Sequence, residues 1–136
     1  MPMDLLARLR TREWNLSAQR RVVAQVLAGE HVHLTAQEVH DLAKRQLPEI
    51  SRSTVYNTLK ELVTMGELVE VDGAGGPTRF DPNVAERHHH LICELCQAIR
   101  DVPRTEPVPD IAEDARGGFL VTAAEITYRG ICPSCA

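Results

Sequence analysis

The chain has 136 residues, of which 43% are hydrophobic and 25% charged, and this balance is typical of a globular protein with one ordinary domain or two small ones. No apolar run approaches the about 18 residues of a membrane span, and the first twelve residues carry charges throughout, so we expect neither membrane association nor a signal peptide. We therefore expect a cytoplasmic protein, in which four cysteines are more often metal ligands or redox groups than disulfides.

The formal net charge of −4 is unevenly distributed along the chain. Residues 1–60 hold nine of the fifteen basic and six of the nineteen acidic side chains, and residues 61–136 hold the rest. The front half is therefore net basic, and the negative total does not exclude nucleic-acid binding by that half. Two units with different partners are indicated, although chance segregation would give the same numbers.

The first 66 residues predict four helices. Leucines at helical spacing mark the first helix within the first ten residues. A second helix follows a Ser17 cap and ends at Gly29. The third begins at the capping box Thr35-Ala36-Gln37-Glu38 and runs to about Leu47, where Pro48 stops it.

The fourth helix, between the Ser51 cap and Gly66, has an aliphatic face and a second face that is free of acidic residues. Two short strands follow, Glu67–Val71 and Thr78–Asp81, joined by the glycine-rich turn 72–77. Helices followed by a hairpin predict a winged helix-turn-helix with the fourth helix in the DNA major groove. The simpler alternative is a solvated amphipathic helix. The residues predicted to contact DNA are Arg52, Ser53, Tyr56, Asn57 and Lys60.

After this hairpin the sequence changes in kind, and we predict a DNA-binding domain over residues 1–81 and a second domain over residues 82–136. The second domain mixes strands with little helix, so the whole chain is expected to be an α+β protein. Its predicted elements are a strand at Arg87–Cys93, its hairpin partner at Ala98–Val102, a short helix between Asp110 and Arg116, and strands at Phe119–Val121 and Glu125–Tyr128.

Two Cys-x-x-Cys motifs, Cys93-Glu94-Leu95-Cys96 and Cys132-Pro133-Ser134-Cys135, lie 35 residues apart. Each motif places two thiolates on one side of a tight turn, and two such turns complete a tetrahedral structural zinc site. A redox dithiol needs only one of the motifs, so thiol redox chemistry is the weaker alternative.

The run His88-His89-His90 falls on a predicted strand, where His88 and His90 point to one face and His89 to the other. The nearby carboxylates are Asp81 at the hinge and Asp101 on the partner strand. Imidazoles with carboxylates suit Fe(II), Mn(II) or Zn(II), so we predict a second metal site here and leave His89 out of it.

Five stretches match one known family, in the same order and across nearly the whole chain. They are His33-Leu34-Thr35-Ala36, Ser53-Thr54-Val55-Tyr56-Asn57-Thr58-Leu59, Thr78-Arg79-Phe80-Asp81, His88-His89-His90-Leu91-Ile92-Cys93-Glu94-Leu95-Cys96 and Gly130-Ile131-Cys132-Pro133-Ser134-Cys135. The chain resembles the ferric uptake regulator (Fur) superfamily. The resemblance implies an N-terminal winged-helix domain, a small C-terminal α/β dimerisation domain, a homodimer, and binding to an AT-rich double-stranded DNA operator.

The resemblance also implies a regulatory metal, Fe(II) or Mn(II), besides the structural Zn(II) held by Cys93, Cys96, Cys132 and Cys135. The regulatory ligands that it implies are His33, Asp81, His88, His90 and Asp101. Because these come from both halves of the chain and the hinge, a shared metal would favour one relative orientation of the halves.

Two features resemble the peroxide-sensing, PerR-like branch of the superfamily. Asp101 stands where iron- and zinc-uptake regulators often carry Glu, and the segment from Gly118 to Cys132 has no histidine for a further metal site. The branch is implied to respond to hydrogen peroxide through iron-catalysed oxidation of a histidine, here His33 or His88, and to control peroxide-defence genes. The alternative within the superfamily is an iron- or manganese-responsive repressor without peroxide chemistry.

Two interpretations from other classes remain. Two histidines and a carboxylate also suit a small non-haem iron enzyme, but the sequence offers no catalytic base, so we expect no enzymatic activity. A zinc-stabilised interaction module without DNA affinity is the other.

Overall fold

The computed structural model describes residues 4–29, 32–72, 76–84, 88–104, 107 and 109–136. The chain divides into two compact units, Met1–Glu86 and Arg87–Ala136. Residues 73–75 of the predicted turn 72–77 and the predicted strand start at Arg87 lie outside the described residues. Within those described ranges, no helix combines the length and the apolar character that crossing a membrane requires.

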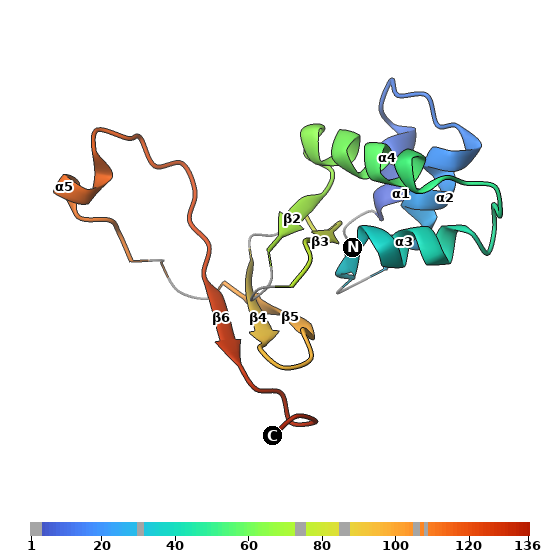
Figure 1. Ribbon diagram of the computed structural model, residues 1–136. Helices are drawn as coiled ribbons and strands as arrows, with labels where there is room; N and C mark the ends of the chain where they lie inside the picture. The colour runs from blue at the N-terminus through green and yellow to red at the C-terminus, as the bar shows by residue number, and fades with distance from the viewer. Residues whose placement is uncertain (1–3, 30–31, 73–75, 85–87, 105–106, 108) are drawn as a thin grey trace. The chain divides into compact units, whose positions relative to one another are not determined.

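Four helices make up most of the first unit: α1 (Leu5–Arg10), α2 (Ala18–Val26), α3 (Ala36–Ala43) and α4 (Arg52–Thr64). Figure 1 shows them gathered together in blue to green. A side-chain oxygen accepts a backbone N–H in the first turn of each helix, and the caps are Asp4, Ser17, Thr35 and Ser51. The capping box at Thr35 and Glu38 is complete, which confirms the predicted start of α3.

A small antiparallel sheet accompanies the helices, with strand order β1-β3-β2. Its strands are β1 (Leu34–Thr35), β2 (Val69–Val71) and β3 (Arg79–Asp81). The hairpin of β2 and β3 was predicted, whereas β1 was not. Two residues are too short for an alternation of polar and apolar side chains, and β1 is defined by its pairing of Leu34 with Phe80.

The core of the first unit is aliphatic. Leu59 and Leu62 of α4 are fully buried against side chains from the other three helices, and Phe80 of β3 closes the core from the sheet. Thr58 is buried as well, and its hydroxyl donates to the Thr54 carbonyl at 2.8 Å. This packing fixes one side of α4 and leaves the opposite side exposed.

The second unit is built on a three-stranded sheet with the order β5-β4-β6. Its strands are β4 (His88–Cys93), β5 (Ile99–Pro103) and β6 (Thr127–Gly130), with β5 antiparallel and β6 parallel to β4. The one-turn helix α5 (Glu113–Arg116) lies in the long connection between β5 and β6. The central position of β4 places its histidines between two neighbouring strands.

Several predicted elements differ from the structure, among them the strand predicted from Glu67, which begins at Val69. Helix α3 ends at Ala43, because the next bonds are three-residue turns such as Gln46 N–H to the Ala43 carbonyl at 3.0 Å. The segment Phe119–Val121 forms no strand and its side chains are exposed, and it follows two glycines with positive φ. The last strand begins at Thr127 instead of Glu125, in register with His90.

Candidate functional site

The four cysteines meet at one end of the sheet of the second unit. Cys93 ends β4, Cys96 follows in the turn to β5, and Cys132 and Cys135 lie just after β6. The four sulfur atoms all lie within 4.8 Å of one another, and those of Cys96 and Cys132 are 3.7 Å apart. Tetrahedral Zn–S bonds of about 2.3 Å imply sulfur separations of about 3.8 Å, so this spacing fits zinc.

The backbone around the cluster orients the sulfur of Cys93. The N–H groups of Cys96 and Cys132 donate to it at 3.5 and 3.4 Å. These hydrogen bonds lower the pKa of the Cys93 thiol to about 6, since they stabilise the thiolate. The Cys132 and Cys96 sulfurs beside Cys135 raise the pKa of its thiol to about 12. The thiolate form is thus favoured at Cys93 and disfavoured at Cys135. A bound dication would stabilise the thiolate at both positions, because its positive charge attracts the anionic sulfur.

Two histidines of β4 and one carboxylate of β5 converge on the same side of this sheet. His90 is the cross-strand partner of Asp101, and its Nε2 lies 3.5 Å from Asp101 Oδ1. His88 Nε2 lies 3.1 Å from the same oxygen and 3.1 Å from His90 Nε2. All three side chains are largely buried, at 10% exposure or less. Two imidazole nitrogens and a carboxylate oxygen this close form a donor set that suits Fe(II), Mn(II) or Zn(II).

His89 faces the other side of β4. Its Nδ1 accepts the Ile126 N–H at 2.9 Å, and its ring lies edge-on to Tyr128 with centroids 6.3 Å apart. The side chain therefore helps to hold the segment leading into β6. Strand alternation predicted this separation from His88 and His90.

The first unit brings together the other two predicted ligands. His33 directly precedes β1 and Asp81 ends β3, and the antiparallel pairing of Leu34 with Phe80 sets them side by side. His33 Nε2 lies 3.2 Å from Asp81 Oδ2, with both side chains buried. The other carboxylate oxygen, Oδ1, accepts the Asn83 N–H at 2.8 Å. Asp81 thus presents one oxygen toward the imidazole, with its orientation fixed by the backbone.

The residues predicted to contact DNA lie on the exposed side of α4, and all five are exposed. Lys60 Nζ is 2.8 Å from Glu70 of β2 and 5.4 Å from the centre of the Tyr56 ring. The hydrogen bond to Glu70 raises the pKa of Lys60. Sequence analysis missed Glu70, because a pairing between a helix and a strand leaves no periodic signal.

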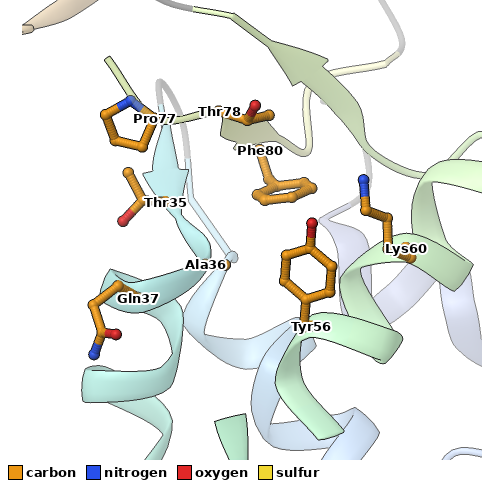
Figure 2. Close-up of a pocket in the computed structure, with 8 residues that line it drawn as sticks. All are labelled: Thr35, Ala36, Gln37, Tyr56, Lys60, Pro77, Thr78 and Phe80. Atoms are coloured by element: carbon orange, nitrogen blue, oxygen red, sulfur yellow. The ribbon is translucent and has the colours of Figure 1, made fainter. Parts of the chain in front are cut away.

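A cavity of about 290 Å³ opens beside this face, between the start of α3, α4 and the hairpin. Figure 2 shows the Tyr56 hydroxyl and the Lys60 ammonium pointing toward the side where Phe80 and Thr78 lie. The residues lining the cavity are Thr35, Ala36, Gln37, Tyr56, Lys60, Pro77, Thr78 and Phe80. The lining holds a cation and several neutral hydrogen-bonding groups but no carboxylate, which suits a polyanion passing over it.

The chain thus carries candidate donor sets for metal ions, sulfur in one cluster and nitrogen and oxygen elsewhere, on a fold that combines helices with small sheets. The chain belongs to the ferric uptake regulator family, whose model matches residues 11–128. It is 29% identical over 134 residues to the transcriptional regulator FurA of Mycobacterium tuberculosis, covering 98% of this chain and 90% of FurA. The peroxide-responsive repressor PerR of Staphylococcus epidermidis is 31% identical over 134 residues, covering 97% of this chain and 88% of PerR.

Among solved structures, the peroxide stress regulator of Campylobacter jejuni matches with a TM-score of 0.68 and 28% identity. The match covers 98% of this chain and all of that one (100%). Relatives named FurA and relatives named PerR therefore resemble this chain to a similar degree. The comparisons establish the family and leave open which signal the chain senses.

Proposed function

We propose that this protein is a metal-dependent, DNA-binding transcriptional repressor that senses hydrogen peroxide. The observation that carries the proposal is the convergence of His88, His90 and Asp101, whose ligand atoms lie 3.1 to 3.5 Å apart. This group occurs in the same chain as an exposed helix face without acidic side chains. A metal centre and a DNA-binding face together are what a metal-responsive repressor needs.

DNA binding is assigned to the first unit as a winged helix-turn-helix. α3 and α4 form the helix pair, α4 enters the major groove, and β2 and β3 form the wing. Exposed Arg52, Tyr56 and Lys60 supply charge and an aromatic ring for phosphates and thymine methyl groups. An AT-rich operator bound by a homodimer is the partner that we propose, in keeping with the family to which the chain belongs.

The regulatory metal is assigned to two groups of ligands, one from each unit. His33 and Asp81 form the first group, and His88, His90 and Asp101 form the second. Each group is close-packed and rich in nitrogen and oxygen donors, which supports Fe(II) or Mn(II). If one ion engages both groups, the ligands hold the two units in a single arrangement, and DNA affinity follows metal concentration.

Structural zinc is assigned to the four cysteines. Their sulfur spacing and the N–H donors to Cys93 support this assignment. Zinc ligation also removes the thiols from redox chemistry, because metal coordination blunts their nucleophilicity. Peroxide sensing therefore has to act at a site other than the cysteines.

We assign peroxide sensing to the histidines. Ferrous iron held at such a site would supply the chemistry that cleaves the O–O bond of hydrogen peroxide, with one oxygen added to a neighbouring imidazole and the other leaving as water. His33 and His88 are the imidazoles proposed to gain oxygen, and Asp101 holds His88 and His90 in place through its Oδ1. Loss of a ligating imidazole would weaken the metal site and release the repressor from DNA.

The test loads the protein, with its zinc retained, with either Fe(II) or Mn(II) and adds dilute hydrogen peroxide. Peptide mass mapping is expected to show one added oxygen on a peptide containing His33 or His88 in the iron form only. Operator binding, followed by fluorescence anisotropy, is expected to fall in parallel. Asp101→Glu is expected to retain metal binding and to blunt the oxidation, since the longer side chain alters coordination.

Two outcomes separate the alternatives. Oxidation of cysteines with zinc loss, at equal rates in the two metal forms, would contradict peroxide sensing and leave a plain metal-responsive repressor. Operator binding that is unaffected by Mn(II) in the unoxidised protein would contradict metal-dependent repression itself.

A further inference from the structure

Two arginines at the N-terminus of the chain share one acidic partner. Arg8 of α1 donates from Nε to Glu67 Oε2 at 2.7 Å, and Arg12 donates from Nη1 to Glu67 Oε1 at 2.7 Å. The Glu67 side chain is only 12% exposed, and each of its oxygens is paired with a guanidinium; the Arg8 side chain is 18% exposed and that of Arg12 is 41% exposed. These pairs tie α1 to the turn between α4 and β2.

Arg8 differs from Arg12 in what else it reaches. Its Nη2 donates to the Glu67 carbonyl at 3.2 Å and to the Pro82 carbonyl at 2.9 Å. Arg12 instead donates to the Met65 carbonyl at 3.1 Å, at the end of α4. Arg8 alone of the two therefore touches the segment that leaves β3.

Pro82 lies between Asp81 and Asn83, the residue whose backbone N–H orients the Asp81 carboxylate. Asp81 is completely buried, and its Oδ1 accepts the N–H of Asn83, one residue beyond Pro82. The orientation of the carboxylate thus depends on the path of the backbone at residues 82 and 83. Arg8 holds that path by its hydrogen bond to the Pro82 carbonyl.

We propose that Arg8 is a positioning residue for the regulatory metal site, acting through Pro82 and Asn83 on the Asp81 carboxylate. The proposal rests on the assignment of His33 and Asp81 as metal ligands. Through Arg8, the orientation of the Asp81 carboxylate is linked to helix α1. Helix α1 would therefore influence how tightly the regulatory metal binds. Groups that hydrogen-bond a ligand directly commonly change metal affinity by about 10- to 100-fold when they are removed, and Arg8 acts one step further out, so we expect the lower end of that range.

Arginine suits this task better than lysine. The planar guanidinium offers donors in several fixed directions, and Arg8 uses them on a carboxylate and two backbone carbonyls. A lysine ammonium could pair with Glu67 but could not span all three acceptors. Arg8→Lys therefore retains the charge and loses the contact with Pro82.

The test compares Arg8→Ala and Arg8→Lys with Arg12→Ala as a matched control. Both alanine variants remove one of the two guanidinium partners of Glu67, so both are expected to lower the unfolding temperature. Only the two Arg8 variants are expected to weaken binding of Mn(II), by up to about tenfold in titrations of the full-length, zinc-retaining protein. Glu67→Gln retains acceptors for Arg8 and is expected to bind Mn(II) with nearly wild-type affinity.

A second measurement needs no regulatory metal. Amide hydrogen exchange at Asn83, followed by NMR in Mn-free protein, is expected to speed up about tenfold in Arg8→Lys and to stay unchanged in Arg12→Ala. Equal Mn(II) affinity and equal Asn83 exchange in the Arg8 and Arg12 variants would overturn the positioning role. If Asp81→Asn itself leaves Mn(II) binding intact, the assignment of Asp81 as a ligand fails first, and the exchange result still decides whether Arg8 fixes the backbone.

Discussion

The two units obtain their stability from different sources. The first has a continuous aliphatic core that draws on all four helices and on Phe80. In the described part of the second, the hydrophobic side chains that are buried are Ile92 and Cys93 only, while Phe119 and Leu120 are 77% and 90% exposed. A unit with so small a core needs a metal or a partner to stay folded. The first unit therefore has a core that can support it alone, whereas the second unit depends on what it binds.

The largest expected effect follows from removing a zinc ligand. Cys96→Ser or Cys135→Ser should release about one zinc per chain and unfold the second unit at a much lower temperature, because zinc-binding energy is folding energy. Zinc content by elemental analysis and thermal unfolding by calorimetry measure the two effects.

Trp14 gives this experiment an internal control. It is the only tryptophan, and it packs in the first unit with the Arg20 guanidinium 4.3 Å above its ring and its indole N–H donating to Glu61 at 3.2 Å. Its fluorescence transition should stay near that of the wild type in both serine variants. Unchanged zinc content in both variants would show that the four-cysteine assignment is wrong.

The next largest effect concerns the two sides of β4. His88→Ala should weaken Mn(II) binding at least 100-fold and abolish metal-stimulated operator binding, since a ligand contributes at least as much as the groups that orient it. Zinc should remain, because the ligand sets do not overlap. Mn(II) titration combined with anisotropy on the operator gives both affinities.

His89 is the matched control on the same strand. His89→Asn keeps a side-chain acceptor near the Ile126 N–H, and it should leave Mn(II) affinity within about threefold of wild type. Metal-dependent binding that survives His88→Ala and is lost in His89→Asn would reverse the assignment of the two faces.

An intermediate effect is expected at the exposed segment Phe119–Val121. A second copy of the chain is the proposed cover for these side chains, and burying one Leu or Phe contributes about 1.5–3 kcal/mol. Leu120→Asp should therefore shift the protein from dimer to monomer at micromolar concentration in sedimentation experiments. The solvated Glu113→Gln is a suitable control, and a Leu120→Asp protein that stays fully dimeric would place the interface elsewhere.

Much of the first unit could be predicted from its sequence because its signals are local. Caps such as Ser17 and Thr35 act within one helical turn, and the aliphatic spacing of α4 repeats every three or four residues. The same holds for the spatial separation of His88 from His89, which follows from strand alternation, and for the pairs of cysteines. Ligation by these groups stays a prediction.

The remainder depends on contacts between distant residues. Strand β1 exists through its pairing with β3, and the Arg8–Glu67 and Lys60–Glu70 pairs join elements whose separation follows no period. The segment Phe119–Val121 has a strand-like composition but no neighbour in the described part of its own unit to pair with. Local patterns identify the elements, and only the folded chain decides which polar groups they bring together.

The smallest effect tests whether the exposed side of α4 differs in kind from its buried side. Tyr56 is 48% exposed, so its replacement should leave the unfolding temperature nearly unchanged, unlike replacement of the fully buried Leu59. Tyr56→Ala should weaken operator binding by about 1–3 kcal/mol if the ring reads bases, and Tyr56→Phe by less, since it loses only the hydroxyl. Figure 2 shows that hydroxyl directed toward the cavity beside α4. Because the hydroxyl is neutral and releases no counterion, the loss in Tyr56→Phe should stay the same when the salt concentration is raised, even if the hydroxyl contacts a phosphate there. Anisotropy titrations at two salt concentrations measure both variants. Insoluble or unfolded Tyr56→Ala protein would show instead that the ring belongs to the core and that α4 is an ordinary amphipathic helix.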